Sequence, residues 1–374
     1  MNKNIIFIVG SGVFSGKEIV SLNLMIGLKN KGHSIFCITS KWASKTFLDA
    51  LINHKIPFKQ VRLGFISKTF SLSAIRMTLH QLLYLPHLLF VVSKIFRAKN
   101  PHLIVHSNYH HTILLFPIIP TTSNNIYHTH EVFSVGNFYK KIIKLLERKM
   151  NIFVGVSDFV SNNLKNFKVN RPVKTIYNGI NYIPNIEVNK GDHELLLKIG
   201  IVGQIGEWKG HEDLIDAIYK LKATYKLNCK CYIFGNDVNN PFADYLKEKI
   251  QRLGLERQFK WKGFVEELEH IYNYFQILTV PTRTNEPLGM TAIEAGFFKI
   301  PVIATNQGGL PEIIDDGVNG FLIPPNNPDN LSHAIERFFL NKNLLQSMGE
   351  SHHQKVNEKF ELNTMVKEFE GLSK

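Results

Sequence analysis

Two glutamates spaced eight residues apart are the first side chains in this sequence that could do chemistry. They lie in EPLGMTAIEAG, residues 286–296, where Pro287 suits the first turn of a helix. On such a helix Glu286 and Glu294 are separated by about 12 Å of rise, so they cannot share a proton or act on one glycosidic bond. They could instead hold the two ends of an elongated, hydroxyl-rich anion, with free amides at residues 288–290 between them. An ordinary helix with one N-terminal and one exposed acid is the competing interpretation.

Two glycine-containing loops could bind phosphate groups. IVGQIGEWKG, residues 201–210, places Lys209 just before an expected helix, where a cation could meet a diphosphate; a solvated surface lysine is the alternative. GSGVFSGK, residues 10–17, feeds another helix, whose free amides and dipole favour anions. It is not a Walker loop, because its glycines have the wrong spacing and Glu18 stands where a magnesium-binding Ser or Thr is needed. A tight turn without a ligand is the other interpretation.

Five histidines lie in or before the segment HTHE, which follows an apolar run. His128 and His130 belong to the segment, and His106, His110 and His111 lie upstream. A metal site is not indicated, because no acidic cluster accompanies the pair. We expect one histidine at the carboxyl end of a strand to be a polar active-site group, and the others to be structural.

The elements that must position these residues alternate between short apolar runs and helical stretches. The runs at 5–9 and 34–39 flank a glycine-rich turn and a helical pattern at about 16–29, which together make a βαβ unit. Similar runs follow at 103–105, 126–128, 152–156 and 175–177, and a second series at 199–202, 230–234, 259–261, 277–280 and 301–304. The sequence therefore predicts an α/β protein with two doubly wound, Rossmann-like domains joined around residues 181–193. Ligands of such sheets bind beyond the carboxyl ends of the strands.

Length and composition are typical of two folded domains. The chain has 374 residues, of which 44% are hydrophobic and 20% charged, and this excludes a disordered, collagen-like or disulfide-scaffold protein. Its three cysteines cannot form a disulfide framework, and a reduced compartment fits them best. The N-terminal apolar run is too short for a signal peptide, and residues 82–92, the longest other run, are about half the roughly 20 residues needed to span a bilayer.

Charge is unevenly distributed along the chain. Residues 1–190 carry 24 basic and 6 acidic side chains, a net charge of +18, whereas residues 191–374 have a net charge of −5. The first half therefore favours an anionic partner: a membrane surface, a phosphorylated substrate or nucleic acid. In residues 62–120 cations interleave with apolar side chains, as in a helix lying in a lipid interface, and a basic helix face packed on its own core is an equally good interpretation. The cations are Arg62, Lys68, Arg76, Lys94, Arg97 and Lys99.

Taken together, these motifs resemble the retaining glycosyltransferases of family four, which have the GT-B fold. The similarity is strongest over residues 199–325, where IVGQIGEWKGHEDLIDAI, KWKGF, EPLGMTAIEAG, PVIATNQGGLPEII and DGVNGFLIPP occur in the family's order and spacing. FSGKE, HTHE, VSDFV and IYNGIN are looser matches in the first half. The resemblance implies two Rossmann-like domains facing a cleft: an acceptor-side domain at 1–185, a sugar-nucleotide-binding domain at 195–350, and a C-terminal helix in 351–374 that packs back towards the first domain.

The same resemblance implies roles for the candidate residues. Glu294 would bind the ribose hydroxyls of a nucleotide, and Glu286 would bind hydroxyls of the donor sugar. Lys209 would stabilise the diphosphate, and His130 would stand at the reacting carbon and face the acceptor. The remaining donor-binding candidates are Gly263 and Phe264 near the base, the segment Leu288, Gly289, Met290 and Thr291 at the diphosphate, and Gly16, Lys17 and Gln204 in the two glycine-containing loops.

Three positions depart from the family's pattern. Gln204 stands where the family commonly has Arg, so one cation for the diphosphate is missing. Lys17 follows Gly16 where a glycine pair is usual, and could supply a replacement cation. Asn181 stands where the family has Asp after NGI.

The implied activity is transfer of a sugar from a nucleotide-diphosphate sugar to a hydroxyl of a glycolipid or polysaccharide acceptor, in bacterial lipopolysaccharide or capsule synthesis. The donor is a co-substrate, and no cofactor or metal is expected, because Lys209 and helix amides would stabilise the departing diphosphate. A sugar-nucleotide epimerase of the same fold and a non-catalytic membrane-associated scaffold are the alternatives.

The expected partners follow from this activity and from the basic first half. They are the nucleotide-sugar donor, a glycolipid or oligosaccharide acceptor and an anionic membrane surface, with no nucleic acid. The protein is therefore expected in the cytoplasm, peripheral on the inner face of the cell membrane.

Overall fold

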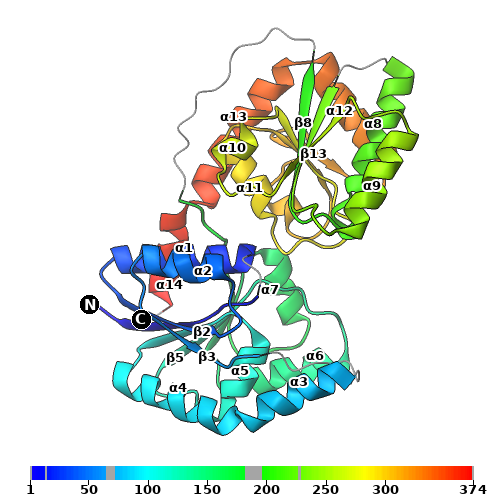
Figure 1. The fold of residues 1–374 in the computed structure, drawn as a ribbon. Helices are drawn as coiled ribbons and strands as arrows, with labels where there is room; N and C mark the ends of the chain where they lie inside the picture. Colours follow the sequence, from blue (N-terminus) through cyan, green and yellow to red (C-terminus); the bar gives the residue numbers. More distant parts are fainter. Residues whose placement is uncertain (1, 13–14, 65–71, 182–195, 226–228, 373–374) are drawn as a thin grey trace. The chain divides into compact units, whose positions relative to one another are not determined.

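The computed structural model describes residues 2–12, 15–64, 72–181, 196–225 and 229–372, which form two compact units (Figure 1). Unit 1 comprises Met1–Asn181 together with Glu361–Lys374, and unit 2 comprises Tyr182–Phe360. The expected linker at residues 181–193 lies outside the described residues except for Asn181. Elements carry the labels of Figure 1.

Unit 1 is built on a seven-stranded parallel sheet in the order β3-β2-β1-β4-β5-β6-β7. Ile5 of β1 lies opposite Ile35 of β2 on one side and Leu103 of β4 on the other, so the order reverses between β1 and β4. In a doubly wound sheet this reversal is the switch point where ligands bind. The strands are β1 (Asn4–Ile8), β2 (Ser34–Ser40), β3 (Phe58–Val61), β4 (Leu103–His106), β5 (Asn124–Thr129), β6 (Ile152–Gly155) and β7 (Val173–Thr175).

Helices cover both faces of this sheet. In Figure 1, α1 and α2 lie on one face, and α3, α4 and α5 lie on the other. Ile6 and Ile8 of β1 pack in one buried cluster with Val92 of α4 and Leu115 of α5. The helices are α1 (Gly16–Asn30), α2 (Lys45–Asn53), α3 (Leu72–Leu83), α4 (Leu85–Lys99), α5 (Tyr109–Leu115), α6 (Asn137–Leu146), α7 (Asp158–Lys165) and α14 (Leu362–Gly371), with a 3-10 turn η1 (Phe116–Ile118).

The C-terminal helix α14 belongs to unit 1 and packs on α1. Gly27 of α1 allows this approach, because a Cβ there would lie 2.4 Å from Cγ2 of Val366. His33 Nε2 lies 2.9 Å from Glu370 Oε1. The chain returns to unit 1 at residue 361, within the span 351–374 in which a C-terminal helix was expected.

Unit 2 repeats the plan with a six-stranded parallel sheet in the order β10-β9-β8-β11-β12-β13. Ile199 of β8 lies opposite Cys231 of β9 and Ile277 of β11, so the switch point falls between β8 and β11. The strands are β8 (Leu197–Val202), β9 (Cys229–Phe234), β10 (Phe259–Gly263), β11 (Ile277–Val280), β12 (Val302–Thr305) and β13 (Gly320–Ile323).

The core of unit 2 forms where helices α8, α9 and α12 pack on the sheet. Ile199 and Ile201 of β8 are buried there with Leu214 of α8, Leu246 of α9 and Ile335 of α12. The helices are α8 (His211–Tyr225), α9 (Pro241–Arg252), α10 (Glu269–Tyr272), α11 (Met290–Phe297), α12 (Pro328–Leu340) and α13 (Asn343–Lys359), with 3-10 turns η2 (Glu207–Lys209) and η3 (Leu310–Glu312).

The expectation of two doubly wound α/β domains is confirmed. Two strands were not predicted from the sequence, β3 and β13, and both lie at sheet edges. The last strand of unit 1 begins and ends two residues before its expected position at 175–177. Of the helices in the described residues, none is long and apolar enough to span a bilayer.

Candidate active site

The strongest candidates of unit 2 lie on loops that follow β8 and β11, the two strands that flank the switch point. Lys209 ends the loop after β8, and Glu286 lies in the loop after β11. Parallel strands place their carboxyl ends at one edge of the sheet, so these two loops must meet there. A third loop, which follows β12, joins them.

Backbone and side-chain bonds hold the first two loops together. The Arg283 amide donates to the Trp208 carbonyl over 2.7 Å, and Thr282 Oγ1 donates to the same oxygen over 2.9 Å. The Arg283 guanidinium also binds Asp213 of α8 with two bonds, Nε to Oδ2 at 3.0 Å and Nη2 to Oδ1 at 2.7 Å. Bidentate pairing of this kind fixes orientation as well as distance, so the two loops form one rigid surface.

The loop after β12 holds the backbone of Glu286 in place. The Gly309 amide donates to the Glu286 carbonyl over 2.8 Å. Gly308, with φ of 64°, comes so close that a Cβ would lie 2.3 Å from that carbonyl oxygen. Gln307 Nε2 donates to the carbonyls of Thr282 and Thr284. A side chain at residue 308 would therefore push Glu286 out of place.

Lys209 and Glu286 form an ion pair. Lys209 Nζ lies 3.0 and 2.9 Å from the two carboxylate oxygens, and the side chains are 23% and 22% exposed. The structure thus brings together Glu286 and Lys209, which the sequence analysis assigned to the donor sugar and to the diphosphate. A phosphate group arriving here would compete with Glu286 for Lys209, and would leave the carboxylate oxygens to accept hydroxyl hydrogens.

Glu294 lies on α11 in a different environment. Tyr272 of α10, which is 1% exposed, donates its hydroxyl to Glu294 Oε2 over 2.6 Å. Burial raises the pKa of Glu294 to about 7, although the hydrogen bond from Tyr272 acts in the opposite direction. The carboxyl group therefore changes its charge near neutral pH.

The N-terminus of α11 lies between the two glutamates. Its N-cap is Gly289, with φ of 113°, which has no side chain to bond the first helical amides. A Cβ at Gly289 would also lie 2.7 Å from Leu310 Cδ2. Leu288 is buried, while Met290 and Thr291 in the first turn are partly exposed. A helix start of this kind, which follows the loop that carries Glu286, the ion-pair partner of Lys209, is suited to an anion.

The other unit 2 candidates, among the described residues, form no hydrogen bond or ion pair with Lys209, Glu286 or Glu294. Gly263 ends β10 with φ of 68°, and its carbonyl accepts from the Gly235 amide at 2.9 Å. The next residue, Phe264, is 67% exposed, so its ring is free to contact a planar group. Gln204 is an exposed residue two positions after β8.

In unit 1, His130 directly follows β5 and lies against His128, with ring centroids 4.3 Å apart. Burial, then the neighbouring His128 and Lys17, lower the pKa of His130 well below its ordinary value, so the imidazole is neutral. Within the described residues its Nε2 has no hydrogen-bond partner. The His128 side chain is fully buried, and burial lowers its pKa to about 3.

The carboxylate of Glu18, in the first turn of α1, is bound by two serines that precede the helix. The buried Glu18 carboxylate accepts from Ser11 Oγ at 2.8 Å, from the Ser15 amide at 3.2 Å and from Ser15 Oγ at 2.6 Å. Lys17 Nζ lies 3.8 Å from Glu18 and 3.9 Å from Glu131. Lys17 thus lies between two carboxylates near His130, and Gly16 is the first residue of the helix.

Arg283, Asp213 and Tyr272 were missed by the sequence analysis. Arg283 follows the expected strand at 277–280 by three residues, so its position at a strand's carboxyl end was a usable signal. Tyr272 gave no such signal, because it meets Glu294 through the packing of α10 on α11.

Two family models match the chain. One, described as glycosyl transferases group 1, matches residues 186–355, and the other, described as glycosyltransferase family 4, matches residues 14–182. Between them they leave only the ends and residues 183–185 unmatched. Fold and motifs together define a GT-B glycosyltransferase architecture. The chain belongs to the glycosyltransferases of the family-four type.

Curated relatives match over part of their length. An uncharacterized glycosyltransferase of Methanocaldococcus jannaschii is 35% identical over 196 residues, which is 52% of each chain. The capsular polysaccharide biosynthesis glycosyltransferase CapM of Staphylococcus aureus is 26% identical over 205 residues, again 52% of each chain. The chain thus spans about half the length of these relatives.

Solved structures match over the whole chain. A glycosyltransferase of Rickettsia africae has a TM-score of 0.81 at 23% identity and covers 100% of this chain and 98% of its own. HepE of Anabaena, solved in complex with UDP-glucose, has a TM-score of 0.78 at 19% identity and covers 100% of both chains. These likenesses show the GT-B fold.

The contact between the two loops predicts that alanine destabilises the protein more at Gly210 than at Gly254. Gly210 and Gly254 both have positive φ, 72° and 64°, so alanine at either position should cost about 1–2 kcal/mol of backbone strain. At Gly210 a Cβ would also lie 1.9 Å from the Pro281 carbonyl oxygen, whereas no described atom lies within 4 Å at Gly254. We expect Gly210→Ala to lower the free energy of unfolding clearly more than Gly254→Ala in urea titrations. Equal losses would contradict the loop contact.

Proposed function

We propose that this protein is a retaining glycosyltransferase. It moves a sugar from a nucleotide-diphosphate sugar to a hydroxyl of a glycolipid or polysaccharide acceptor, in the synthesis of a bacterial surface polysaccharide such as lipopolysaccharide or capsule. The observation that carries the proposal is the arrangement of Lys209, Glu286, the α11 N-terminus and Glu294 on one edge of the unit 2 sheet. Membership of the glycosyltransferase family and the name of the matched capsular relative support it.

The arrangement provides a separate contact for each part of the donor. Glu294 accepts hydrogen bonds from the ribose hydroxyls, and the α11 amides with Lys209 bind the diphosphate. Glu286 accepts from hydroxyls of the sugar. Phe264 contacts the base. Hydroxyl acceptors at both ends, with a cation and amides between them, suit an elongated anion of this class.

The chemical step breaks the bond between the sugar C1 and the diphosphate oxygen. Negative charge grows on that oxygen as it departs, and Lys209 and the α11 amides stabilise it, so the proposal requires no metal. The acceptor hydroxyl attacks C1 from the face that the diphosphate leaves, and its proton passes to a departing phosphate oxygen. The new bond therefore has the configuration of the old one. We assign to His130 of unit 1, whose imidazole is kept neutral by burial, a contact with the transferred sugar at its reacting carbon.

The direct experiment incubates the protein with a panel of nucleotide-diphosphate sugars, with and without a polyprenyl-phosphate-linked sugar as acceptor. Nucleotide diphosphate released together with a new glycosidic bond, and only when acceptor is present, is the expected result. Conversion of the donor into an isomeric nucleotide sugar would show an epimerase. Binding without any turnover over the whole panel would show a non-catalytic protein.

Glu294 should make donor binding dependent on pH. The ribose hydroxyls donate to the ionised carboxylate, and the pKa of Glu294 in the protein without ligand is about 7. The affinity for the donor should therefore fall below pH 7, by up to about tenfold for each pH unit. Above pH 7 it should level off. Isothermal titration with UDP-glucose checks this, and Glu294→Gln should bind weakly with no such slope. A Glu294→Gln profile parallel to that of the native protein would remove Glu294 from the site.

Lys209 should act mainly on turnover. Because additional negative charge builds on the diphosphate during departure, Lys209→Ala should lower kcat by roughly 100-fold and raise the donor KM less than that. Lys220→Ala is the matched control, since Lys220 forms an exposed ion pair with Asp329 on the surface of unit 2. A rise in KM with kcat unchanged would show that Lys209 only positions the donor.

Unit 1 carries a surface suited to an anionic membrane. On α3 and α4 the side chains of Leu79, Leu83 and Phe90 are 61%, 74% and 57% exposed, and Lys94 and Arg97 are exposed on α4. This combination of apolar and basic side chains is the pattern of interfacial helices. Of the other expected cations, Lys99 is exposed and its Nζ lies 4.9 Å from the centroid of the Phe36 ring, and Arg62 stacks on the Tyr84 ring. Lys68 lies outside the described residues, and the Arg76 side chain is not described. We propose peripheral attachment of the protein to the inner face of the cell membrane through this surface.

Vesicle sedimentation tests the attachment. The protein should pellet with phosphatidylglycerol vesicles at low salt, and less at high salt or with phosphatidylcholine, because each cation contributes about 1 kcal/mol that salt screens. Exchanging Lys94 and Arg97 for Glu should release it, whereas Lys220→Glu in unit 2 should not. Recovery in the supernatant under all conditions would disprove the attachment and leave the transferase proposal intact.

A further inference from the structure

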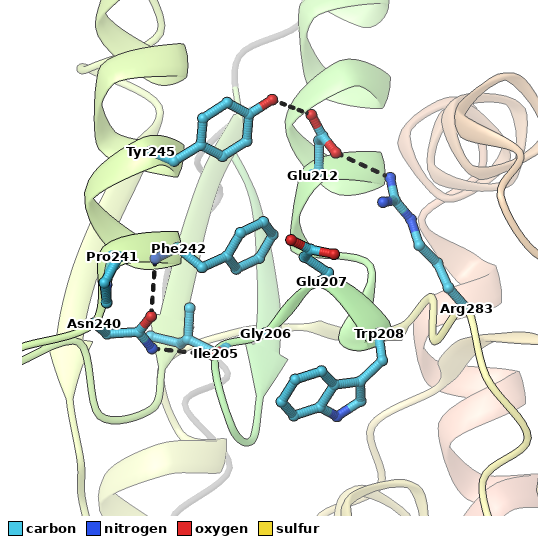
Figure 2. Close-up of a pocket in the computed structure, with 10 residues that line it drawn as sticks. All are labelled: Ile205, Gly206, Glu207, Trp208, Glu212, Asn240, Pro241, Phe242, Tyr245 and Arg283. Atoms are coloured by element: carbon cyan, nitrogen blue, oxygen red, sulfur yellow. Dashed lines mark hydrogen bonds and ion pairs between the residues drawn. The ribbon is translucent and has the colours of Figure 1, made fainter. Parts of the chain in front are cut away.

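Unit 2 contains a pocket of about 750 Å³ beside the candidate active site (Figure 2). Its lining comes from η2, the starts of α8 and α9, and the loop after β11. Neither Lys209 nor Glu286 lines it, but Trp208 and Arg283 do, and these residues belong to the same two loops. The volume lies within the range of small-molecule sites. The contacts proposed for the donor make no use of this pocket.

Three aromatic rings form much of its wall. Trp208 and Tyr245 are 44% and 42% exposed, and Tyr245 stacks on Phe242 with centroids 5.8 Å apart and an angle of 25°. The Trp208 indole is supported by Gly206, where a Cβ would lie 2.5 Å from two ring carbons. The ring therefore packs flat against backbone while much of its surface stays open.

Hydrogen-bonding groups stand between these rings. In Figure 2 the carboxylates of Glu207 and Glu212 lie between Trp208 and Tyr245. Glu212 is held by Tyr245 Oη at 2.6 Å, and also by Lys249 and Arg283. Burial opposes ionisation, but these bonds lower the pKa of Glu212 to about 2, so it is charged at neutral pH.

The pocket also contains one unpaired carboxylate and a fixed loop. The Glu207 carboxylate is exposed and accepts no hydrogen bond in the described part of the chain, whereas the Glu207 carbonyl accepts from the Gly210 amide. Asn240 caps α9 by accepting from the amides of Phe242 and Ala243, and its Nδ2 donates to the Ile205 carbonyl at 2.9 Å. The loop after β8 is thereby tied to α9.

We propose that this pocket binds one or more sugar rings of the acceptor, so that the acceptor is an oligosaccharide chain rather than a single sugar. A sugar ring has an apolar C–H face, which packs on an aromatic plane, and equatorial hydroxyls, which donate to carboxylates. The pocket offers both kinds of contact. This inference rests on the proposed function, and it adds a chain-binding site to the transfer centre.

Charge decides against an anionic occupant. Lys249 and Arg283 pair with three carboxylates, Glu212, Asp213 and Asp216, and Glu207 adds a fourth, so acids outnumber cations here. Acidic side chains disfavour a phosphate group. Open aromatic faces beside hydroxyl acceptors suit a neutral, hydroxyl-rich chain, and competition by an organic cation tests the other occupant that acids and rings could hold. The pocket shares η2 with Lys209, which suits sugar units that precede the reacting one.

The test measures binding without turnover. Hexasaccharides of glucose, mannose and N-acetylglucosamine, with the matching monosaccharides, are titrated against the protein while the indole N–H signals of its three tryptophans are followed by NMR. We expect at least one hexasaccharide to shift the Trp208 signal and to bind at least roughly tenfold more tightly than its monosaccharide. Failure of every hexasaccharide to shift that signal would overturn the proposal.

Matched variants locate the contact. Trp208→Ala keeps the backbone carbonyl that Arg283 and Thr282 bind, and Gly206→Ala displaces the ring without removing it. Both should weaken hexasaccharide binding roughly tenfold, and Trp42→Ala, which removes an exposed tryptophan of unit 1, should not. Equal binding by Trp208→Ala and the native protein would overturn the proposal, as would displacement of the hexasaccharide by tetramethylammonium.

The two proposals fail in distinguishable ways. Donor turnover by a protein that binds no hexasaccharide would disprove the sugar-binding role of the pocket and leave the transferase proposal intact. Hexasaccharide binding at Trp208 without any donor turnover would support the role of the pocket and disprove the transferase proposal. With a chain acceptor, Trp208→Ala should raise the acceptor KM while the donor KM stays unchanged.

Discussion

The pairing of Arg283 with Asp213 is the interaction on which the rest of the unit 2 site depends. It joins the loop after β11 to the first turn of α8, and the Arg283 amide adds a bond to the Trp208 carbonyl. Lys209 follows Trp208 directly, and Glu286 follows Arg283 by three residues. The distance between Lys209 and Glu286 is therefore set by a bidentate ion pair away from the reacting atoms. Because Glu212 and Lys249 extend the pair into a network, it is worth more than an isolated surface pair.

The same pairing decides whether Arg283 could replace the arginine that the family commonly has at the position of Gln204. Gln204 leaves a cation short in the expected pattern, and the Arg283 guanidinium is already held by two carboxylates, Glu212 and Asp213. Moving Arg283 to a phosphate would break the contact between the loops. Lys17 is likewise engaged, between Glu18 and Glu131 of unit 1. In the proposed reaction, the stabilisation of a departing diphosphate would consequently rest on Lys209 and the α11 amides.

The fold was predictable from the sequence because the buried strands are continuous apolar runs, and β1, β8 and β11 are examples. The edge strands β3 (FKQV) and β13 (GFLI) were not, since one carries two polar residues and the other follows a glycine-rich turn. Lys209 and Glu286 could be selected by their positions after strands. Their ion pair could not, because it requires β8 and β11 to be neighbours although 74 residues separate the end of one from the start of the other. Tyr272 was hidden for the same reason, since its hydroxyl meets Glu294 only in the folded chain.

The two glutamates show how one residue type acquires two properties within a single segment. Glu286, on a loop, is partly exposed and paired with a cation, so its charge is balanced before any ligand arrives. Glu294, on the following helix, faces a buried tyrosine, and burial brings its pKa to about 7. Lys209, the cation that would stabilise a leaving group, must therefore give up its pairing with Glu286. Glu294, by contrast, must lose a proton. A donor bound as proposed would meet these as separate costs at its two ends, because the two glutamates lie eight residues apart on a loop and a helix.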